Sequence, residues 1–245
     1  METSPSTSNS GFSSKPKIFH SLRPPISLPP STIPFSLPDY VFSLLPHSPP
    51  APSFLIDAAT RRRIPLSRLP HLVHTLASNL RRYFHLSKYD VAFILSPNSV
   101  HIPLLYLSLL SLGVIISPSN PLSSAPEVSR QIHLTKPVIA FATSVTAATL
   151  PFLPKGTVLL DSPQFESLLV SCTSPPSHDV FVPAEVFQND TAAILYSSGT
   201  TGRVKGVELT HRNFVAAIAG VHAGGGAGRK RSSGGWEELG VGWEL

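Results

Sequence analysis

One run of small hydroxyl and glycine residues with a single lysine is the part of the sequence best suited to chemistry. Residues 197–207 read Ser-Ser-Gly-Thr-Thr-Gly-Arg-Val-Lys-Gly-Val and follow the apolar pair Ile194-Leu195 and Tyr196. Glycines let backbone N–H groups approach an anion closely and adopt positive φ where a turn needs it. Hydroxyls donate hydrogen bonds to phosphate oxygens, and a lysine such as Lys205 adds a positive charge. The run therefore predicts a phosphate-binding loop that follows a β-strand.

The two commonest glycine-rich phosphate motifs do not fit this run. A Walker A loop places Lys after Gly and before Ser or Thr, whereas Lys205 lies between Val204 and Gly206. The dinucleotide pattern G-x-G-x-x-G is also absent from the run. A generic P-loop NTPase is therefore disfavoured. Further along, Thr210 is predicted to cap a helix that contains residues 214–218.

Residues 197–207 resemble the signature S-S-G-T-T-G-x-P-K-G-V of adenylate-forming enzymes, with Val204 at the proline position. A flexible Ser/Gly-rich loop without a ligand is the alternative interpretation. The resemblance implies that ATP phosphates, with Mg²⁺ alongside, are held by Ser197, Ser198, Gly199, Thr200, Thr201, Gly202 and Lys205. It assigns no catalytic residue here, because the family's catalytic lysine belongs to a later domain.

Four upstream segments narrow the resemblance. Residues 18–25, 95–99, 109–113 and 120–122 look like plant 4-coumarate–CoA ligases and their relatives, and the likeness spans about 18–221. It implies an ATP-dependent carboxylic acid–CoA ligase, of the kind found in phenylpropanoid metabolism. Such an enzyme converts an acid to an acyl-adenylate, releases pyrophosphate and passes the acyl group to coenzyme A. ATP, Mg²⁺ and coenzyme A would be its co-substrates, with a small carboxylic acid whose identity stays open.

Composition divides the chain into three parts. Twelve of the 26 prolines lie in residues 1–52, and eight of the 15 glycines lie in 222–245. We expect 1–17 to be a disordered extension, 18–221 a partial AMP-binding domain, and 222–245 a Gly-rich tail without family likeness, of the kind a translated intron or shifted reading frame produces. The family's adenine and acyl pockets and catalytic lysine would follow later. We therefore expect this chain alone to be inactive, and a non-catalytic interaction protein is the alternative function.

Periodicity predicts an α/β fold with a mostly parallel βαβ sheet. The resemblance implies that this sheet is the partial N-terminal domain of an adenylate-forming enzyme. Apolar residues recur at helical spacing from Leu69 to Leu80. The other predicted helices are 37–45, 98–113, 127–134, 144–150 and 165–170. The predicted strands are 54–57, a segment near Ile64, 91–95, 114–116, 137–141, 157–160 and 194–195.

Composition also excludes several classes of protein. The net charge of +5 is spread along the chain, whereas nucleic-acid binding needs clustered Lys and Arg. A single cysteine, Cys172, rules out a disulfide framework and a cysteine-based zinc site. His71 and His74 fit helix packing better than metal binding, so no metal site is predicted. The apolar run 102–116 is too short to span a membrane and fits a buried helix and strand. Cytosol and peroxisome, and the oligomeric state, stay open.

Three other features allow two interpretations each. Tyr196, next to the loop, either flanks a nucleotide or simply ends a strand. Arg61-Arg62-Arg63 forms either an anion site or, as we favour, a solvated hairpin tip. Glu208 either caps a backbone group or faces solvent.

Overall fold

The computed structural model describes residues 11–13, 17–22, 25–46, 53–170, 184–197 and 204–228, with side chains up to 223. Cys172 and the Pro-rich segment 174–183 lie outside these residues. The chain forms two compact units. One contains Pro29–Ala216, and the other contains Met1–Leu28 and Ala217–Leu245.

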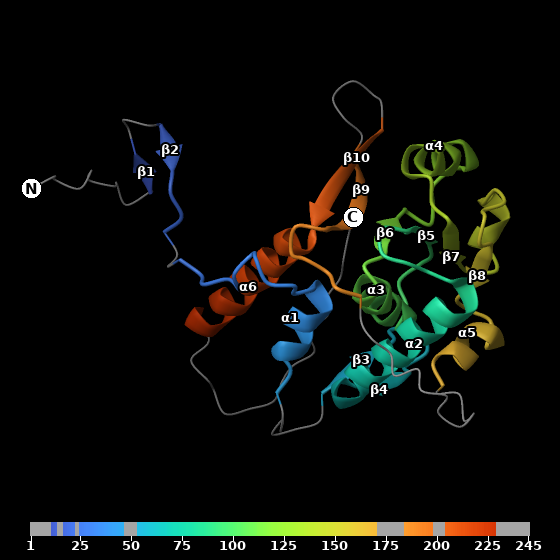
Figure 1. The fold of residues 1–245 in the computed structure, drawn as a ribbon, viewed down its shortest axis with the longest axis horizontal. Coiled ribbons are helices and arrows are strands. Elements are labelled where there is room, and N and C mark those ends of the chain that lie inside the picture. Colours follow the sequence, from blue (N-terminus) through green and yellow to red (C-terminus); the bar gives the residue numbers. More distant parts are fainter. Residues whose placement is uncertain are drawn as a thin grey trace, which may run out of the picture. The chain divides into compact units, whose positions relative to one another are not determined.

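A six-stranded sheet organises the larger unit, in the order β10-β9-β6-β5-β7-β8. Its strands are β5 (Val91–Leu95), β6 (Ile115–Pro118), β7 (Ile139–Ala142), β8 (Thr157–Leu159), β9 (Thr191–Ser197) and β10 (Lys205–Thr210). All neighbouring pairs are parallel except β9 and β10, which form an antiparallel hairpin (Figure 1). The predicted α/β fold with a mostly parallel sheet is confirmed.

Two helical crossovers set the strand order. Helix α3 (His101–Ser111) joins β5 to β6, and helix α4 (Ala125–Thr135) carries the chain from β6 past β5 to β7. The sheet thus grows first to one side of β5 and then to the other, which is typical of doubly wound sheets. The middle strands are buried on both faces, as the all-buried pattern of β7 illustrates.

The remaining helices pack around this frame. Helix α2 (Leu69–Phe84) buries Val73, Leu76 and Leu80, which share one helical face, and its backbone at Val73 accepts a hydrogen bond from Ser108 of α3 at 3.0 Å. The helix predicted from residue 69 is confirmed. Helix α2 contacts the one-turn 3₁₀ helix η1 (Leu66–Arg68) and helix α5 (Pro163–Leu168), and the 3₁₀ helix η2 (Thr146–Thr149) connects β7 and β8 along the chain. Across the described part of the chain, no helix is long and apolar enough to cross a membrane, and 102–116 forms most of α3 and the start of β6.

Short elements form the N-terminal part of the chain. Helix α1 (Leu37–Ser43) starts at a capping box, in which Ser36 Oγ accepts the Asp39 N–H and the Asp39 carboxylate accepts the Ser36 N–H. In the other unit, β1 (Phe12–Ser13) pairs with β2 (Ile18–Phe19), so a strand lies within the predicted 1–17 extension. Helix α6 (His211–Gly228) runs past the boundary predicted at residue 221.

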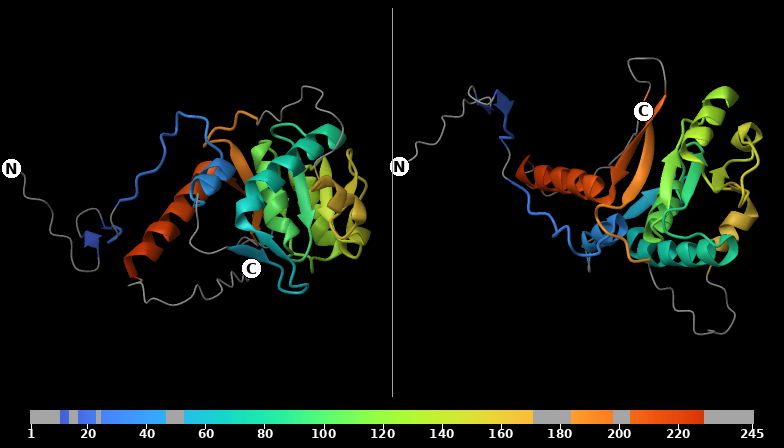
Figure 2. Two further views of the ribbon diagram at one scale, coloured as in Figure 1. Left: turned by 90° about the horizontal axis from the view of Figure 1, so that it is seen from below. Right: turned by 45° about the horizontal axis from the view of Figure 1, so that its top comes forward.

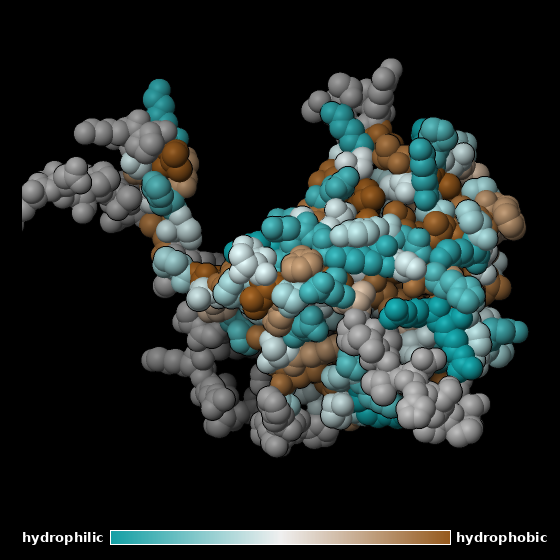
Figure 3. Space-filling view, in the orientation of Figure 1, coloured by the Kyte–Doolittle hydropathy of each residue, from teal (hydrophilic) through white to brown (hydrophobic). Residues whose placement is uncertain are grey.

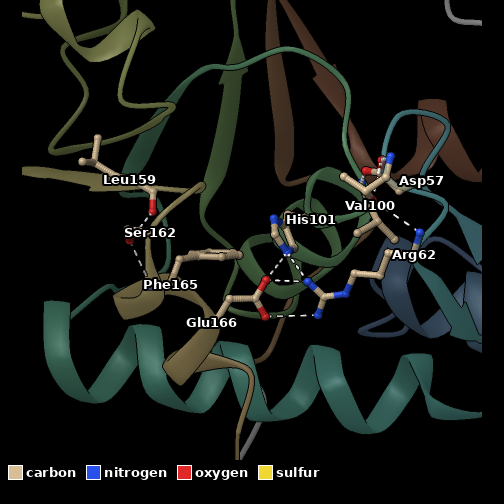
Figure 4. Close-up of polar contacts among 9 residues, drawn as sticks. Asp57, Arg62, Val100, His101, Leu159, Ser162, Phe165 and Glu166 are labelled. Atoms are coloured by element: carbon tan, nitrogen blue, oxygen red, sulfur yellow. Dashed lines mark hydrogen bonds and ion pairs between the residues drawn. The ribbon is translucent and has the colours of Figure 1, made fainter.

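Strands β3 (Phe54–Ile56) and β4 (Arg63–Pro65) form a hairpin, which is linked by a hydrogen bond to the start of α3 and by an ion pair to α5 (Figure 4). The buried carboxylate of Asp57 accepts the N–H of Val100 at 3.1 Å and the N–H of Thr60 at 2.8 Å. These backbone hydrogen bonds, led by the one from Thr60, lower the pKa of Asp57 to about 2. Because Thr60 lies in the hairpin turn and Val100 directly precedes α3, the Asp57 carboxylate joins the turn to the start of α3.

The three arginines at this hairpin have separate environments. Arg61 takes a positive φ of 61°, as a hairpin turn requires. Arg62 forms a two-pronged ion pair with Glu166, whose carboxylate also lies 2.8 Å from His101 Nε2. Arg63 stacks over the Phe54 ring at 5.8 Å. The segment is a hairpin tip, as favoured. Two of its three positive charges also have partners, Glu166 for Arg62 and the Phe54 ring for Arg63.

Candidate functional site

The β9–β10 hairpin brings the two ends of the predicted phosphate loop together. Ser197 is the last residue of β9, Lys205 is the first residue of β10, and the two are direct partners in the antiparallel ladder. Both are exposed. Directly opposed residues in such a ladder have Cβ atoms about 5 Å apart on one face. A hydroxyl and an ammonium group therefore stand on the same side of the hairpin, beside its tip.

The other predicted site residues fall at the tip itself. Ser198, Gly199, Thr200, Thr201 and Gly202 lie outside the described residues, so the structure gives their neighbours but not their geometry. Strand β10 was not among the predicted strands. Val207 and Leu209 alternate with Glu208 and Thr210, but this pattern covers only four residues directly after the loop, and pairing with β9 makes it a strand.

One face of the hairpin below this pair is apolar. Leu195 pairs with Val207, and their exposed fractions are 37% and 43%. Because residues two apart on a strand point to the same side, these side chains lie on the face of Ser197 and Lys205. Brown apolar surface is visible over the hairpin in Figure 3. The Ser197–Lys205 pair therefore lies between the loop and the exposed apolar pair Leu195–Val207.

The opposite face of the hairpin meets helix α4. Tyr196 Oη lies 2.5 Å from Ser117 Oγ of β6 and 3.2 Å from Thr135 Oγ1 of α4. Burial raises the pKa of Tyr196, so the phenol stays protonated at neutral pH. Tyr196 is thus the next-to-last residue of β9, close to the interpretation that it ends a strand, and its hydroxyl is hydrogen-bonded inside the protein. Sequence patterns show its position beside the loop and carry no signal for these partners.

The base of the hairpin leads directly into α6. Thr210 caps this helix, because Asn213 N–H donates to Thr210 Oγ1 at 3.3 Å and the Asn213 side chain accepts the Thr210 N–H at 2.9 Å. The predicted cap is confirmed. Glu208 is exposed and accepts from the Thr191 hydroxyl at 3.3 Å, which fits the interpretation that it faces solvent.

Across the described residues, no group of three or more His, Cys, Asp and Glu side chains is arranged to hold a metal ion. Mg²⁺ usually binds through one or two carboxylates together with substrate phosphates and water. Such binding does not need a cluster of three of these side chains.

Comparison with plant proteins gives close relatives that are longer than this chain. It is 47% identical over 226 residues to 4-coumarate–CoA ligase-like 9 of Arabidopsis thaliana, covering 87% of this chain and 40% of the relative. It is 41% identical to 4-coumarate–CoA ligase-like 5 of Oryza sativa subsp. japonica, covering 88% and 39%. Peroxisomal OPC-8:0-CoA ligase 1 of Arabidopsis thaliana is 35% identical, with 86% and 39% covered. The chain spans about two fifths of the length of these relatives.

Solved structures share the fold. The N-terminal subdomain of Klebsiella oxytoca NpsA superposes with a TM-score of 0.60 at 22% identity, covering 74% of this chain and 43% of that one. An ATP-bound RpMatB-BxBclM chimera gives a TM-score of 0.60 at 23% identity, covering 74% and 36%. The family of AMP-binding enzymes matches residues 48–233, which include the whole hairpin. This chain therefore belongs to the AMP-binding enzyme family.

Proposed function

We propose that this chain provides the ATP-phosphate-binding part of a carboxylic acid–CoA ligase of the 4-coumarate–CoA ligase-like kind. The observation that carries the proposal is the direct opposition of Ser197 and Lys205 at the two ends of the hydroxyl- and glycine-rich loop. The names of the plant relatives support a CoA ligase as the kind of enzyme.

The reaction proposed for the whole enzyme has two steps. A carboxylate oxygen of the acid attacks the α-phosphorus of ATP, forming the acyl-adenylate and releasing pyrophosphate. The thiol of coenzyme A then attacks the acyl carbon, and AMP leaves. Within this scheme, Lys205 would offset negative charge on the phosphates, and Ser197 would donate a hydrogen bond to a phosphate oxygen. Mg²⁺ would neutralise further charge when bound with ATP.

The chain by itself is proposed to bind Mg·ATP weakly and to make no thioester. The phosphate loop supplies contacts to only one end of the nucleotide, and base and ribose contacts would have to come from elsewhere. With few contacts, little free energy remains after the cost of immobilising the ligand.

The test is isothermal titration of the purified chain with Mg·ATP, with inorganic tripolyphosphate as a second probe. Lys205→Ala should weaken the binding of both ligands about tenfold to a hundredfold, because a charge-assisted hydrogen bond contributes roughly 1.5–3 kcal/mol. Arg68→Ala, which removes one positive charge from η1, is the matched control and should leave both affinities unchanged. Equal weakening in both variants would indicate general charge attraction and reject the loop. Pyrophosphate release dependent on an added acid would contradict the proposed inactivity.

A second candidate function is a non-catalytic interaction with a longer relative. The exposed Leu195–Val207 pair favours it, together with the position of β10 at the end of the strand order. Co-purification of the chain with 4-coumarate–CoA ligase-like 9, lost in Val207→Asp and retained in the exposed control Val145→Asp, is the expected result. Retention of the complex by Val207→Asp would exclude this surface.

A further inference from the structure

The loop-bearing end of β9 extends beyond the ladder that joins it to the sheet. Strand β6 pairs with β9 at Ile116 opposite Ala193, and β9 then continues to Ser197 with β10 on its other side. The right-hand view of Figure 2 shows the two orange strands beside the green strands of the sheet. Side-chain contacts are therefore needed to hold the end of the hairpin against the sheet.

Tyr196 supplies such a contact through a chain of hydroxyl groups. The Thr135 hydroxyl donates to the carbonyl oxygen of Gln131 at 3.0 Å, which uses its only proton. Thr135 Oγ1 can then only accept from Tyr196 Oη, at 3.2 Å. The Tyr196 proton is thereby used, so Ser117 Oγ donates to Tyr196 Oη at 2.5 Å. With Thr135 donating to Gln131, the order Ser117 to Tyr196 to Thr135 gives every hydroxyl proton an acceptor, and Tyr196 Oη also lies 3.5 Å from the Gln131 carbonyl oxygen.

This chain of hydrogen bonds joins three elements in a buried place. Ser117 of β6 is fully buried, and Thr135 and Gln131 of α4 are each 8% exposed. The Tyr196 ring also packs against the buried cluster that contains Phe93, Leu95 and Val128. Hydrogen bonds in such surroundings polarise one another, and an unpaired partner is costly. The end of β9 is thus tied to both β6 and α4.

Helix α4 also contacts the second strand of the hairpin. A Cβ added at Gly206, the residue after Lys205, would lie 3.4 Å from Leu134 Cδ2 of α4 and 3.0 Å from Ile194 Cγ2. Gly206 is the ladder partner of Tyr196. One helix therefore meets both strands at the ladder position next to Ser197 and Lys205.

We propose that Tyr196 is a positioning residue for phosphate binding, whose hydroxyl bonds to Ser117 and Thr135 fix the Ser197–Lys205 pair relative to the sheet. The proposal rests on the proposed function for its ligand, Mg·ATP. The hydrogen-bonded group of Ser117, Thr135 and Tyr196, called the brace below, lies wholly within the described residues. Tyr196 acts through Ser197 and Lys205 and has no role in the chemical step.

The first experiment measures the brace without any ligand. Amide hydrogen exchange is compared between the wild-type chain, Tyr196→Phe, Ser117→Ala and the double variant. We expect exchange in residues 191–197 and 204–210 to rise about threefold to tenfold in Ser117→Ala, which loses one hydrogen bond of roughly 0.5–1.5 kcal/mol. The rise should be at least as large in Tyr196→Phe, which also loses the contact with Thr135. Exchange in β5 should stay unchanged. The double variant should exchange no faster than Tyr196→Phe, because the two groups share one interaction.

The control removes the hydroxyl of another tyrosine. Tyr40 of α1 has no hydrogen bond from its hydroxyl among the described residues, so Tyr40→Phe should leave exchange in the hairpin as in wild type. Faster exchange in β5 as well as the hairpin would mean that Tyr196 serves general stability, and the proposal would fail. Unchanged exchange in Tyr196→Phe, or additive effects in the double variant, would equally overturn it.

The second experiment connects the brace to the ligand. Titration with Mg·ATP should give a dissociation constant about threefold to tenfold higher for Tyr196→Phe than for wild type, and an unchanged constant for Tyr40→Phe. If the wild-type chain does not bind Mg·ATP, the proposed function fails while the exchange data still decide the brace. If wild type and Tyr196→Phe bind equally, the positioning role is rejected and the proposed function stands.

Discussion

The imidazole of His211 accepts the backbone N–H of Leu37 through Nδ1 at 3.0 Å, which joins the starts of α6 and α1 across 174 residues of sequence. His211 is fully buried, and its Nε2 has no hydrogen-bond partner among the described residues. Burial lowers the pKa of His211 to about 4, although Asp190 and Asp39 oppose the shift while Lys88 adds to it. Because Nδ1 must accept this bond, the folded state requires a neutral ring.

Mild acid is therefore expected to destabilise the chain through His211. Its pKa is about 4 when folded and 6.5 as the ordinary value, so the unfolded state binds more protons between these limits. Stability is complete above the ordinary value and falls as the pH drops towards the folded pKa. Urea unfolding should give a free energy about 2 kcal/mol lower at pH 5 than at pH 7.

Two variants isolate this contribution. His211→Gln offers an amide oxygen that does not titrate, so the loss between pH 7 and pH 5 should largely disappear. His71→Gln, at an exposed position of α2, should retain it. An unchanged pH dependence in His211→Gln would show that another group is responsible.

Removal of the Asp57 carboxylate should destabilise the β3–β4 hairpin strongly. Asp57→Ala leaves the N–H groups of Thr60 and Val100 without their acceptor, and we expect a loss of about 2 kcal/mol in unfolding free energy. Asp57→Asn should lose less, since its amide oxygen still accepts. The pKa of about 2 lies below the ordinary 3.8, so the ionic part is present above pH 3.8 and lost as the pH falls towards 2. Equal stability of Asp57→Ala and wild type would contradict the structure.

Two glycine-to-alanine changes should alter the free energy of unfolding in opposite directions. Gly113 has a φ of +69°, and an added Cβ would lie 2.7 Å from Lys88 Cγ, so Gly113→Ala should cost about 1–3 kcal/mol. Gly220 lies inside α6 with no atom within 4 Å of an added Cβ, so Gly220→Ala should gain roughly 0.5–1 kcal/mol. Thermal unfolding of both variants checks the pair. A stabilised Gly113→Ala would reject the positive-φ turn.

The ion pair of Arg62 and Glu166 should contribute little despite its short contacts. Their side chains are 42% and 43% exposed, and exposed pairs are usually worth less than about 1 kcal/mol. A double-mutant cycle with Arg62→Met and Glu166→Gln should give a coupling free energy below that value, smaller still at high salt. A coupling that persists at high salt would indicate that His101, which also contacts Glu166, shields the pair from solvent.

The amino-acid sequence alone was enough to predict most elements of the sheet unit. Leu69, Val73, Leu76 and Leu80 predict α2 because helical spacing places them on one face, and the structure buries all four. The Thr210 cap was also predictable, because a helix cap is a local interaction between residues three apart in the sequence. Residues 197–207 predicted a phosphate loop, and that assignment remains a prediction, because residues 198–203 lie outside the described part of the chain.

What only the tertiary structure decided are the relationships between distant residues. Strand β10 has a weak local pattern and exists because β9 pairs with it. The partners of Tyr196 lie 79 residues away at Ser117 and 61 residues away at Thr135, and His211 meets Leu37 across a still longer gap. Local spacing reports which face of an element is apolar, whereas hydroxyl and imidazole partners depend on how the crossovers stack the elements. The sequence alone therefore determined the family resemblance and the elements, and folding decided which side chains support the predicted site.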